Sequence, residues 1–268
     1  MRQEEKYLEL RHKTVVKANE LIQRSRFALT AQQQKILLTI IAQVNPGDEE
    51  FKLYEFSVPE FCKAAGLDYD SGGNYSKLKA AIKAITDKSL WVTLENGQET
   101  LLRWIEKPYI DHKSGTVQIK LDRDMKPYLL QIKQNFTSYE LLWTLRFKSK
   151  YSTRLYELIK SVHFHETEIY SRDFALDELC RMVGASYTAY QDIKARVLEP
   201  AVAEINRYSD KNLSWEPIRG RSGKKVAGIR LTISSKEGME RIKLQDETEK
   251  ELGMDQLTLW DMLQGKGK

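Results

Sequence analysis

The chain has 268 residues, of which 41% are hydrophobic and 30% are charged, and its formal net charge is +5. This composition is typical of a globular protein with a buried core, and the length favours two domains over a single small one. It excludes an intrinsically disordered chain, and no apolar run approaches the ~20 residues of a membrane-spanning helix, so we expect a cytoplasmic protein that contacts no membrane.

Apolar spacing and turn residues outline the elements of the first half. Thr30 is a good N-cap for a helix over Ala31–Val44, whose apolar residues recur every three or four positions. Beyond it the pattern predicts a strand over Phe51–Phe56, a helix over Asn74–Ile85, two hairpins over Leu90–Leu94 with Thr100–Trp104 and Tyr109–Asp111 with Thr116–Leu121, and helices over Asp122–Ile132 and Ser138–Leu145. A helix over Ser152–Val162 opens the second half.

A stretch in the second half repeats the residue pattern of a stretch in the first. The first copy reads Phe56-Ser57-Val58-Pro59-Glu60-Phe61-Cys62-Lys63, and the second reads Phe174-Ala175-Leu176-Asp177-Glu178-Leu179-Cys180-Arg181. Each copy continues through a glycine into a longer helix and then into a two-stranded ribbon, which is the plan of a winged helix. The sequence therefore predicts an α+β protein with two tandem winged-helix domains related by internal duplication.

The repeat also divides the chain. We expect winged-helix domains over residues 15–135 and 136–235, followed by a flexible, polar tail over residues 236–268. Cys62 and Cys180 lie at matching positions of the two copies, and neither has a Cys or His neighbour at ligand spacing. We therefore expect neither a disulfide nor a metal site, and the sequence indicates no cofactor.

The longer helix of the second copy carries the main candidates for DNA contact. Ser186 can cap this helix, and its buried face is formed by Tyr190, Ile193, Val197, Ala201 and Ile205. The first exposed residues of such a helix reach base edges in the major groove. The candidates are Tyr187, Thr188, Gln191 and Arg196, which lie largely off the buried face, and Lys194, which lies near its margin. The alternative is a solvent-exposed face of an ordinary packing helix.

Basic residues outside this helix add further candidates. The stretch from Arg219 to Arg230 holds five basic residues and no acidic one, and the wing candidates in it are Arg219, Arg221, Lys224 and Lys225. They can follow phosphates or enter a minor groove, although an ordinary solvated hairpin would look similar. In the first domain Asn74, Lys77, Lys79 and Lys83 flank an apolar stripe. DNA contact and dimerisation are equally good interpretations of that helix.

Three motifs resemble the iteron-binding plasmid replication initiators. They are Val15-Val16-Lys17-Ala18-Asn19-Glu20-Leu21-Ile22, Ser149-Lys150-Tyr151-Ser152-Thr153-Arg154-Leu155-Tyr156-Glu157-Leu158, and Val197-Leu198-Glu199-Pro200-Ala201 with Glu204-Ile205-Asn206. The resemblance implies two winged-helix domains that bind short direct repeats at an origin, with monomers on the repeats and dimers, joined through the first domain, on the protein's own promoter.

The function that this resemblance implies is a DNA-binding initiator that is not an enzyme. It would bind origin repeats, help to melt the origin, and recruit the host initiator, the replicative helicase and the sliding clamp. One alternative is a transcriptional repressor of the same fold. The other is a rolling-circle nickase built on His163, His165 and Tyr190. The nickase is disfavoured because His163 continues a helix, where residues two apart point away from each other.

The last motif lies near the C-terminus. Gln256-Leu257-Thr258-Leu259-Trp260 resembles the bacterial sliding-clamp-binding peptide, with clamp-binding candidates Gln256, Leu257, Leu259 and Trp260. In such a peptide two apolar anchors fill a preformed groove while the glutamine amide fixes the register. The alternative is a short amphipathic helix over Leu257–Leu263 that docks on the protein's own surface.

Overall fold

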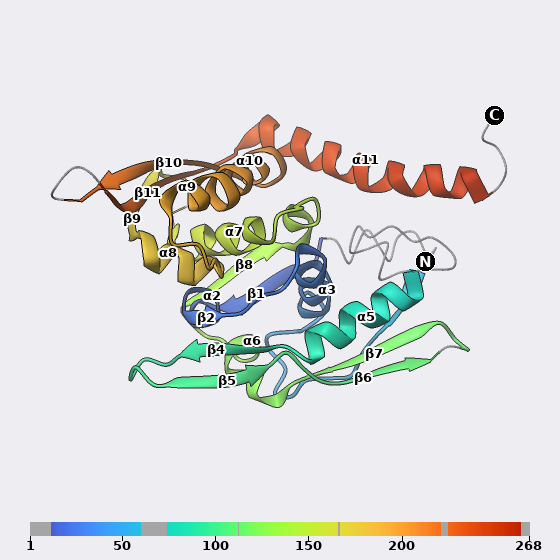
Figure 1. Ribbon diagram of the computed structural model, residues 1–268. Helices are drawn as coiled ribbons and strands as arrows, with labels where there is room; N and C mark the ends of the chain where they lie inside the picture. Colours follow the sequence, from blue (N-terminus) through green and yellow to red (C-terminus); the bar gives the residue numbers. More distant parts are fainter. Residues whose placement is uncertain (1–11, 60–73, 112, 166, 221–224, 264–268) are drawn as a thin grey trace.

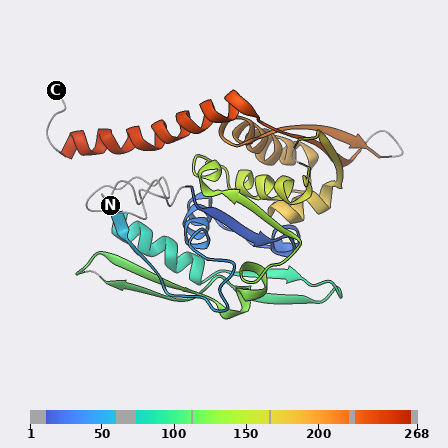
Figure 2. The same ribbon diagram turned by 180° about the vertical axis from the view of Figure 1, so that it is seen from behind.

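The computed structural model describes residues 12–59, 74–111, 113–165, 167–220 and 225–263. Two α+β halves lie on either side of a central helix, α7 (Lys150–Val162), and a two-stranded sheet beside it (Figure 1). The view from behind shows the same stacking (Figure 2). Within the described ranges, no helix combines the length and the apolar character that crossing a bilayer would require.

The first half contains two three-stranded sheets with helices packed against them. Its elements are β1 (Thr14–Ala18), α2 (Asn19–Arg24), β2 (Ser25–Arg26), α3 (Ala31–Ile41), β3 (Tyr54–Ser57), α5 (Asn74–Thr86), β4 (Ser89–Thr93), β5 (Glu99–Arg103), β6 (Ile105–Asp111), β7 (Thr116–Leu121), a 3-10 turn over Arg123–Met125, α6 (Lys126–Leu129), β8 (Phe136–Glu140) and a second 3-10 turn over Leu141–Thr144. The strand orders are β2-β4-β5 and β3-β7-β6.

The second half is a single winged-helix unit with one sheet. After α7 come β9 (Tyr170–Ala175), α8 (Leu176–Val183), α9 (Tyr190–Ile193), a π-helical turn over Lys194–Leu198, α10 (Glu199–Tyr208), β10 (Lys211–Arg219), β11 (Val226–Ser235) and α11 (Gly238–Leu263). The strand order is β10-β11-β9. Ile229, Leu231 and Ile233 alternate along β11 and are fully buried, which is the period that one packed face of a strand requires.

The two halves share an order of elements but differ in strand pairing. Phe56 of β3 and Phe174 of β9 are each the next-to-last residue of their strand. β9 pairs with the hairpin that follows its helices, whereas β3 pairs with β7 of the second hairpin, and the first hairpin β4–β5 pairs with β2. Cys62 lies outside the described residues, and Cys180 of the second copy is buried.

The structure corrects the expected helix over Ser138–Leu145. Residues 136–140 form strand β8, which pairs antiparallel with β1, and a 3-10 turn follows. Thr137 and Tyr139 are buried while Phe136 and Ser138 are exposed, so the burial has the two-residue period of a strand. The expected domain boundary between residues 135 and 136 separates β8 from its partner β1.

The neighbouring helix is also shorter than expected. Only Arg123–Leu129 of the expected Asp122–Ile132 is helical, as a 3-10 turn followed by α6. Gln131 has a φ of 51°, and this left-handed conformation is incompatible with continuing a right-handed helix. The chain leaves the helix at Leu130 in an extended conformation and leads into β8.

Most of the tail expected to be flexible, over residues 236–268, is helical in the structure. Residues 238–263 form the long helix α11 instead (Figure 1). Leu244, Thr248 and Leu252 follow one another at intervals of four and are buried on one face of it. Arg146 donates a 3.2 Å hydrogen bond to the Thr248 hydroxyl and forms an ion pair with Glu251. The sequence did not indicate this packing because only two of the three buried residues are apolar.

The N-terminus of α7 is held by a carboxylate from α10. Both oxygens of Glu204 lie 3.1 Å from the backbone nitrogen of Lys148, and Oε2 lies 3.1 Å from that of Ser149. Ser152 donates a 2.6 Å hydrogen bond to the same oxygen. The side chain therefore satisfies the two backbone amides that directly precede α7, and its negative charge complements the helix dipole.

We predict that Glu204→Ala lowers the free energy of unfolding by about 2 kcal/mol, because hydrogen bonds to a charged acceptor are lost and the backbone amides just before α7 lose their partner. Urea unfolding of the full chain measures this loss. The matched control is Glu95→Ala in the exposed turn of the β4–β5 hairpin, which should change stability by less than about 0.5 kcal/mol. Equal effects of the two substitutions would contradict the role given to Glu204.

Candidate nucleic-acid interface

The turn before the candidate DNA-contacting helix is longer than expected. α8 ends at Gly184, whose φ of 72° is the left-handed conformation that a glycine allows at a helix C-terminus. The next helix begins at Tyr190, not after Ser186, so Tyr187 and Thr188 precede the helix. The Tyr187 ring lies edge-on to Tyr151 of α7, with 6.5 Å between ring centroids, and this packing holds the turn against the central helix.

The helix that follows contains a π-helical turn. The Glu199 amide donates to the carbonyl of Lys194, five residues back, so one extra residue is accommodated before α10. Pro200 follows directly, and in a regular helix its ring would clash with the carbonyl of Arg196. The wider turn relieves that clash and buries both Val197 and Leu198. Lys194 and Arg196 therefore lie on the irregular turn, and such turns are frequent at functional sites.

Acidic neighbours hold the two basic candidates of this helix. Arg196 is 63% exposed, its Nε lies 3.1 Å from Asp192 Oδ1, and its guanidinium lies 5.6 Å from the centre of the Tyr187 ring. Lys194 Nζ lies 3.6 Å from Glu199 Oε1. Exposed pairs of this kind contribute about 0.2–1 kcal/mol. Both cations can therefore exchange their carboxylate partners for a phosphate or a base edge at little cost.

A groove joins the start of this helix to the base of the wing. It has a volume of about 500 Å³ and is lined by Leu176, Thr188, Ala189, Tyr190, Gln191, Arg219, Lys225 and Val226. The structure thus brings together four candidates from two distant stretches, namely Thr188, Gln191, Arg219 and Lys225. Two cations beside an amide and a hydroxyl form a surface suited to a sugar–phosphate backbone. Arg221 and Lys224 lie outside the described residues.

One basic residue of the wing stretch has a structural role. Arg230 on β11 donates two hydrogen bonds to Asp173 on β9, at 2.7 and 2.8 Å. These hydrogen bonds from the guanidinium hold the pKa of Asp173 below its usual value. Arg230 therefore joins the two paired strands, and the positive charge available for DNA lies nearer the tip of the hairpin.

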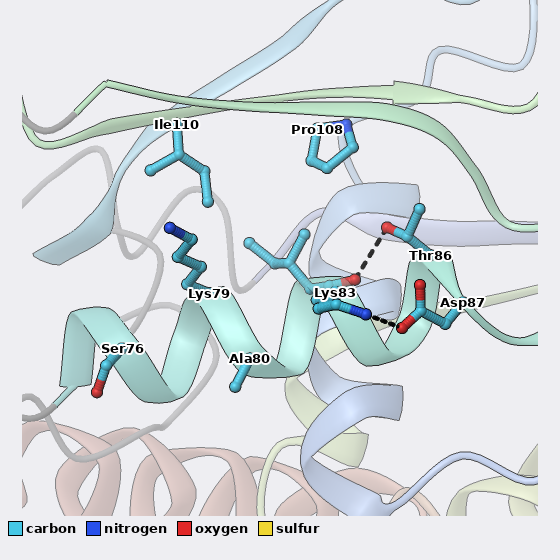
Figure 3. Close-up of a pocket in the computed structure, with 9 residues that line it drawn as sticks. Ser76, Lys79, Ala80, Lys83, Thr86, Asp87, Pro108 and Ile110 are labelled. Atoms are coloured by element: carbon cyan, nitrogen blue, oxygen red, sulfur yellow. Dashed lines mark hydrogen bonds and ion pairs between the residues drawn. The ribbon is translucent and has the colours of Figure 1, made fainter.

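The candidates of the first half lie on α5. Lys77, Lys79 and Lys83 are exposed, opposite the buried face formed by Leu78, Ala81, Ile82 and Ile85, while the Asn74 side chain lies outside the described residues. Figure 3 shows Lys79 reaching toward Ile110 of β6, and Lys83 joined to Asp87. The groove between helix and strand has a volume of about 570 Å³ and includes Pro108. The exposed lysines and the groove of α5 are compatible both with DNA contact and with dimerisation.

The residues of the nickase hypothesis do not come together. The His163 ring is buried, its Nε2 lies 2.8 Å from the Glu168 carbonyl oxygen, and its Nδ1 lies 3.3 Å from Lys211 Nζ. His165 is exposed, and Tyr190 is half-buried against the core. Within the described part of the chain, no cluster of three or more His, Cys, Asp or Glu side chains could hold a metal ion.

Two features of the site were not foreseen from the sequence. Asp192, which pairs with Arg196, could have been found from its spacing of four residues on a helix. Pro200 inside the expected helix was the signal for the irregular turn. The clamp-binding candidates Gln256, Leu257, Leu259 and Trp260 fall within α11, but their side chains lie outside what the structure describes.

Known proteins resemble this chain in sequence and in fold. A replication initiation protein of Escherichia coli is 27% identical over 208 residues, which cover 74% of this chain and 64% of that protein. The PI protein of Escherichia coli is 26% identical over 157 residues, which cover 52% of this chain and 50% of that protein. The chain thus spans less than two thirds of the length of these curated relatives.

A solved structure adds the likeness in fold. The crystal structure of the Pi initiator protein in complex with iteron DNA superposes with a TM-score of 0.71 at 18% identity, over 85% of this chain and 99% of that one. The model for the initiator replication protein, WH1, matches residues 14–160, and the model for the initiator Rep protein, WH2, matches residues 175–233. These matches confirm the two tandem winged helices, and the chain belongs to the family of initiator replication proteins.

Proposed function

We propose that this protein is a plasmid replication initiator that binds repeated sites in origin DNA, chiefly through its second winged helix. The observation that carries the proposal is the groove that places Thr188 and Gln191 beside Arg219 and Lys225. The family, and a structural neighbour whose title reports a complex with iteron DNA, support it. The protein acts in the cytoplasm, by binding and without covalent chemistry.

The geometry suggests how the second domain engages DNA. The turn and first residues of α9 enter the major groove, where Thr188 and Gln191 lie at base edges or phosphates. Arg196 and Lys194 leave Asp192 and Glu199 for the DNA, and Arg219 and Lys225 follow the phosphate backbone. The contacts to phosphates release counterions and supply affinity, while the contacts to base edges supply specificity.

The wider role of the protein follows from the same proposal. Monomers bind the origin repeats and help to melt the adjacent duplex, while dimers joined through the first domain bind the protein's own promoter. The host initiator, the replicative helicase and the sliding clamp are the expected partners. Footprinting on DNA that flanks the gene tests the binding step. Copying of a plasmid with the cognate origin tests initiation, since a repressor of the same fold would protect DNA without supporting replication.

We predict that Arg196→Ala weakens binding to the cognate repeat by about 1–3 kcal/mol and weakens binding to random DNA much less, because a base contact is lost. Fluorescence anisotropy at fixed salt measures both affinities. The control is Arg181→Ala, which removes an exposed arginine with the same kind of intrahelical pair on α8. Equal losses of affinity for the two DNAs would show that Arg196 contacts a phosphate and not a base.

The wing should contribute affinity without specificity. Replacing Arg219 and Lys225 together by alanine should weaken binding to all sequences and reduce the slope of log affinity against log salt by roughly two, since each phosphate contact contributes about 0.9. A salt titration from low to physiological ionic strength measures the slope. Lys243→Ala on α11, also exposed, is the control that should leave it unchanged. An unaltered slope in the double variant would remove the wing from the interface.

The clamp-binding peptide makes a separate prediction. The full chain should bind the host's sliding clamp, and the variant with Gln256, Leu259 and Trp260 changed to alanine should lose that binding, because both apolar anchors and the amide are removed. Calorimetry with purified clamp measures it. α11 spans these positions, so an extended bound peptide would require the end of the helix to unwind. Equal binding by both chains would favour the alternative of a helix that docks on the protein itself.

A further inference from the structure

Arg154 of α7 joins the two domains from a buried position. Its guanidinium Nη2 lies 3.1 Å from the carbonyl oxygens of Ile22 and Ser25, which belong to the first domain, and 2.6 Å from that of Met182 on α8, in the second. Only 3% of its side chain is exposed, and the guanidinium also lies 4.3 Å from the centre of the Phe27 ring. One side chain therefore binds backbone from both domains.

Glu157, one turn further along α7, makes a second connection. It accepts hydrogen bonds of 2.6 Å from Lys17 Nζ on β1 and of 2.6 Å from the Tyr139 hydroxyl on β8. The exposed fractions of the Lys17 and Glu157 side chains are 4% and 1%. Burial lowers the pKa of Lys17, and the charge of Glu157 opposes that shift. A buried pair of this kind tolerates little displacement, because a separated charge would be left without a partner.

A third contact fixes the same joint sterically. A Cβ atom at Gly184, at the end of α8, would lie 2.8 Å from the carbonyl oxygen of Phe27 in the first domain. The backbone of the second domain therefore approaches the first more closely than any other residue type would allow. This approach lies next to Met182, so the steric contact and the Arg154 hydrogen bonds act on one joint.

Both helices that carry DNA-contact candidates pack onto α7, either directly or through one other helix. α10 packs directly on α7, and α5 packs on α3, which itself packs on α7. Figures 1 and 2 show α5 and α9–α10 on opposite sides of that central helix. An apolar joint could rotate while keeping its burial, whereas hydrogen bonds from Arg154 to three carbonyls are lost by small rotations. The relative position of α5 and α9 is therefore set at this joint.

We propose that Arg154, Glu157 and the Gly184–Phe27 contact act as positioning residues that set the spacing, in base pairs, between the two halves of the DNA site. The inference rests on the proposed function and takes the DNA-contact interpretation of α5, which would lie at one half of the site, with α9 and its π turn at the other. One base pair advances the DNA by about 3.4 Å and rotates it by about 34°. A fixed joint cannot follow such a change, so the spacing becomes part of the specificity.

The experiment uses the full chain and a site selected from random DNA, with base pairs inserted or deleted between its two protected segments. We expect the unmodified protein to lose at least about tenfold in affinity for a change of one base pair, since the DNA must deform to fit. Arg154→Met should lose less than about threefold for the same change. Its affinity for an isolated second half should match that of the unmodified protein. Arg24→Met, an exposed arginine on α2, is the control.

Two further variants keep the test decisive if Arg154→Met does not fold. Arg154→Lys retains part of the hydrogen bonding and should relax the spacing preference less than the methionine variant. Gly184→Ala places a methyl group against the Phe27 carbonyl oxygen and should relax the spacing preference without any change in charge. A general loss of stability would lower affinity at every spacing equally. Spacing preferences unchanged in every variant that folds would overturn the inference.

A measurement without DNA separates this inference from the proposed function. Spin labels at Ser76→Cys on α5 and Ala195→Cys on the π turn, in a Cys62→Ser background, report the distance between the two elements. The distribution should be narrow for the unmodified joint and should broaden in Arg154→Met. Absence of any sequence-selective binding would refute the proposed function. A narrow distribution in both proteins, or one protected segment in place of two, would refute the inference alone.

Discussion

The burial of α7 on all sides is the constraint on which the rest of the structure depends. A helix between two domains has no solvent face for polar side chains, so each must find a partner inside. Tyr156 donates a 2.7 Å hydrogen bond to Asp210, and Glu157 accepts one from Lys17. Near the N-terminus of the helix, Ser152 donates a hydrogen bond to Glu204. These partners come from both domains, and the position of one domain on the other follows from satisfying them.

The same logic explains why the candidate DNA-contacting helix is irregular. α10 must place Glu204 at the start of α7 and bury Ala201 and Ile205 against it. The Pro200 ring would clash with the carbonyl of Arg196 if the segment formed a regular α-helix. The π turn reconciles the two demands, and it places Lys194 and Arg196 on the part of the helix whose direction is decided by packing on α7. Structural and functional residues are thereby coupled within one short segment.

The sequence predicted the elements whose signals are local. The repeat revealed the two winged helices, and alternation predicted the wing strands, because periodicity and turn residues are properties of a short stretch. It did not predict β8, whose partner β1 lies near the start of the chain, or α11, whose packing depends on Arg146. Nor did it predict the late start of α9, which follows from Tyr187 packing on Tyr151. Each of these differences arises from a contact between residues that are far apart in the sequence.

The motif that most strongly indicates the family does not lie at the candidate DNA interface. Arg154, Tyr156 and Glu157 of the stretch Ser149–Leu158 are buried at the domain joint. The candidates for reading DNA, such as Gln191 and Arg196, are exposed and can change without disturbing the core. A resemblance carried by the joint therefore indicates how the two domains are held together, whereas the candidate DNA contacts are side chains outside the motif. Relatives with this joint and different exposed residues should bind different repeats in a similar overall arrangement.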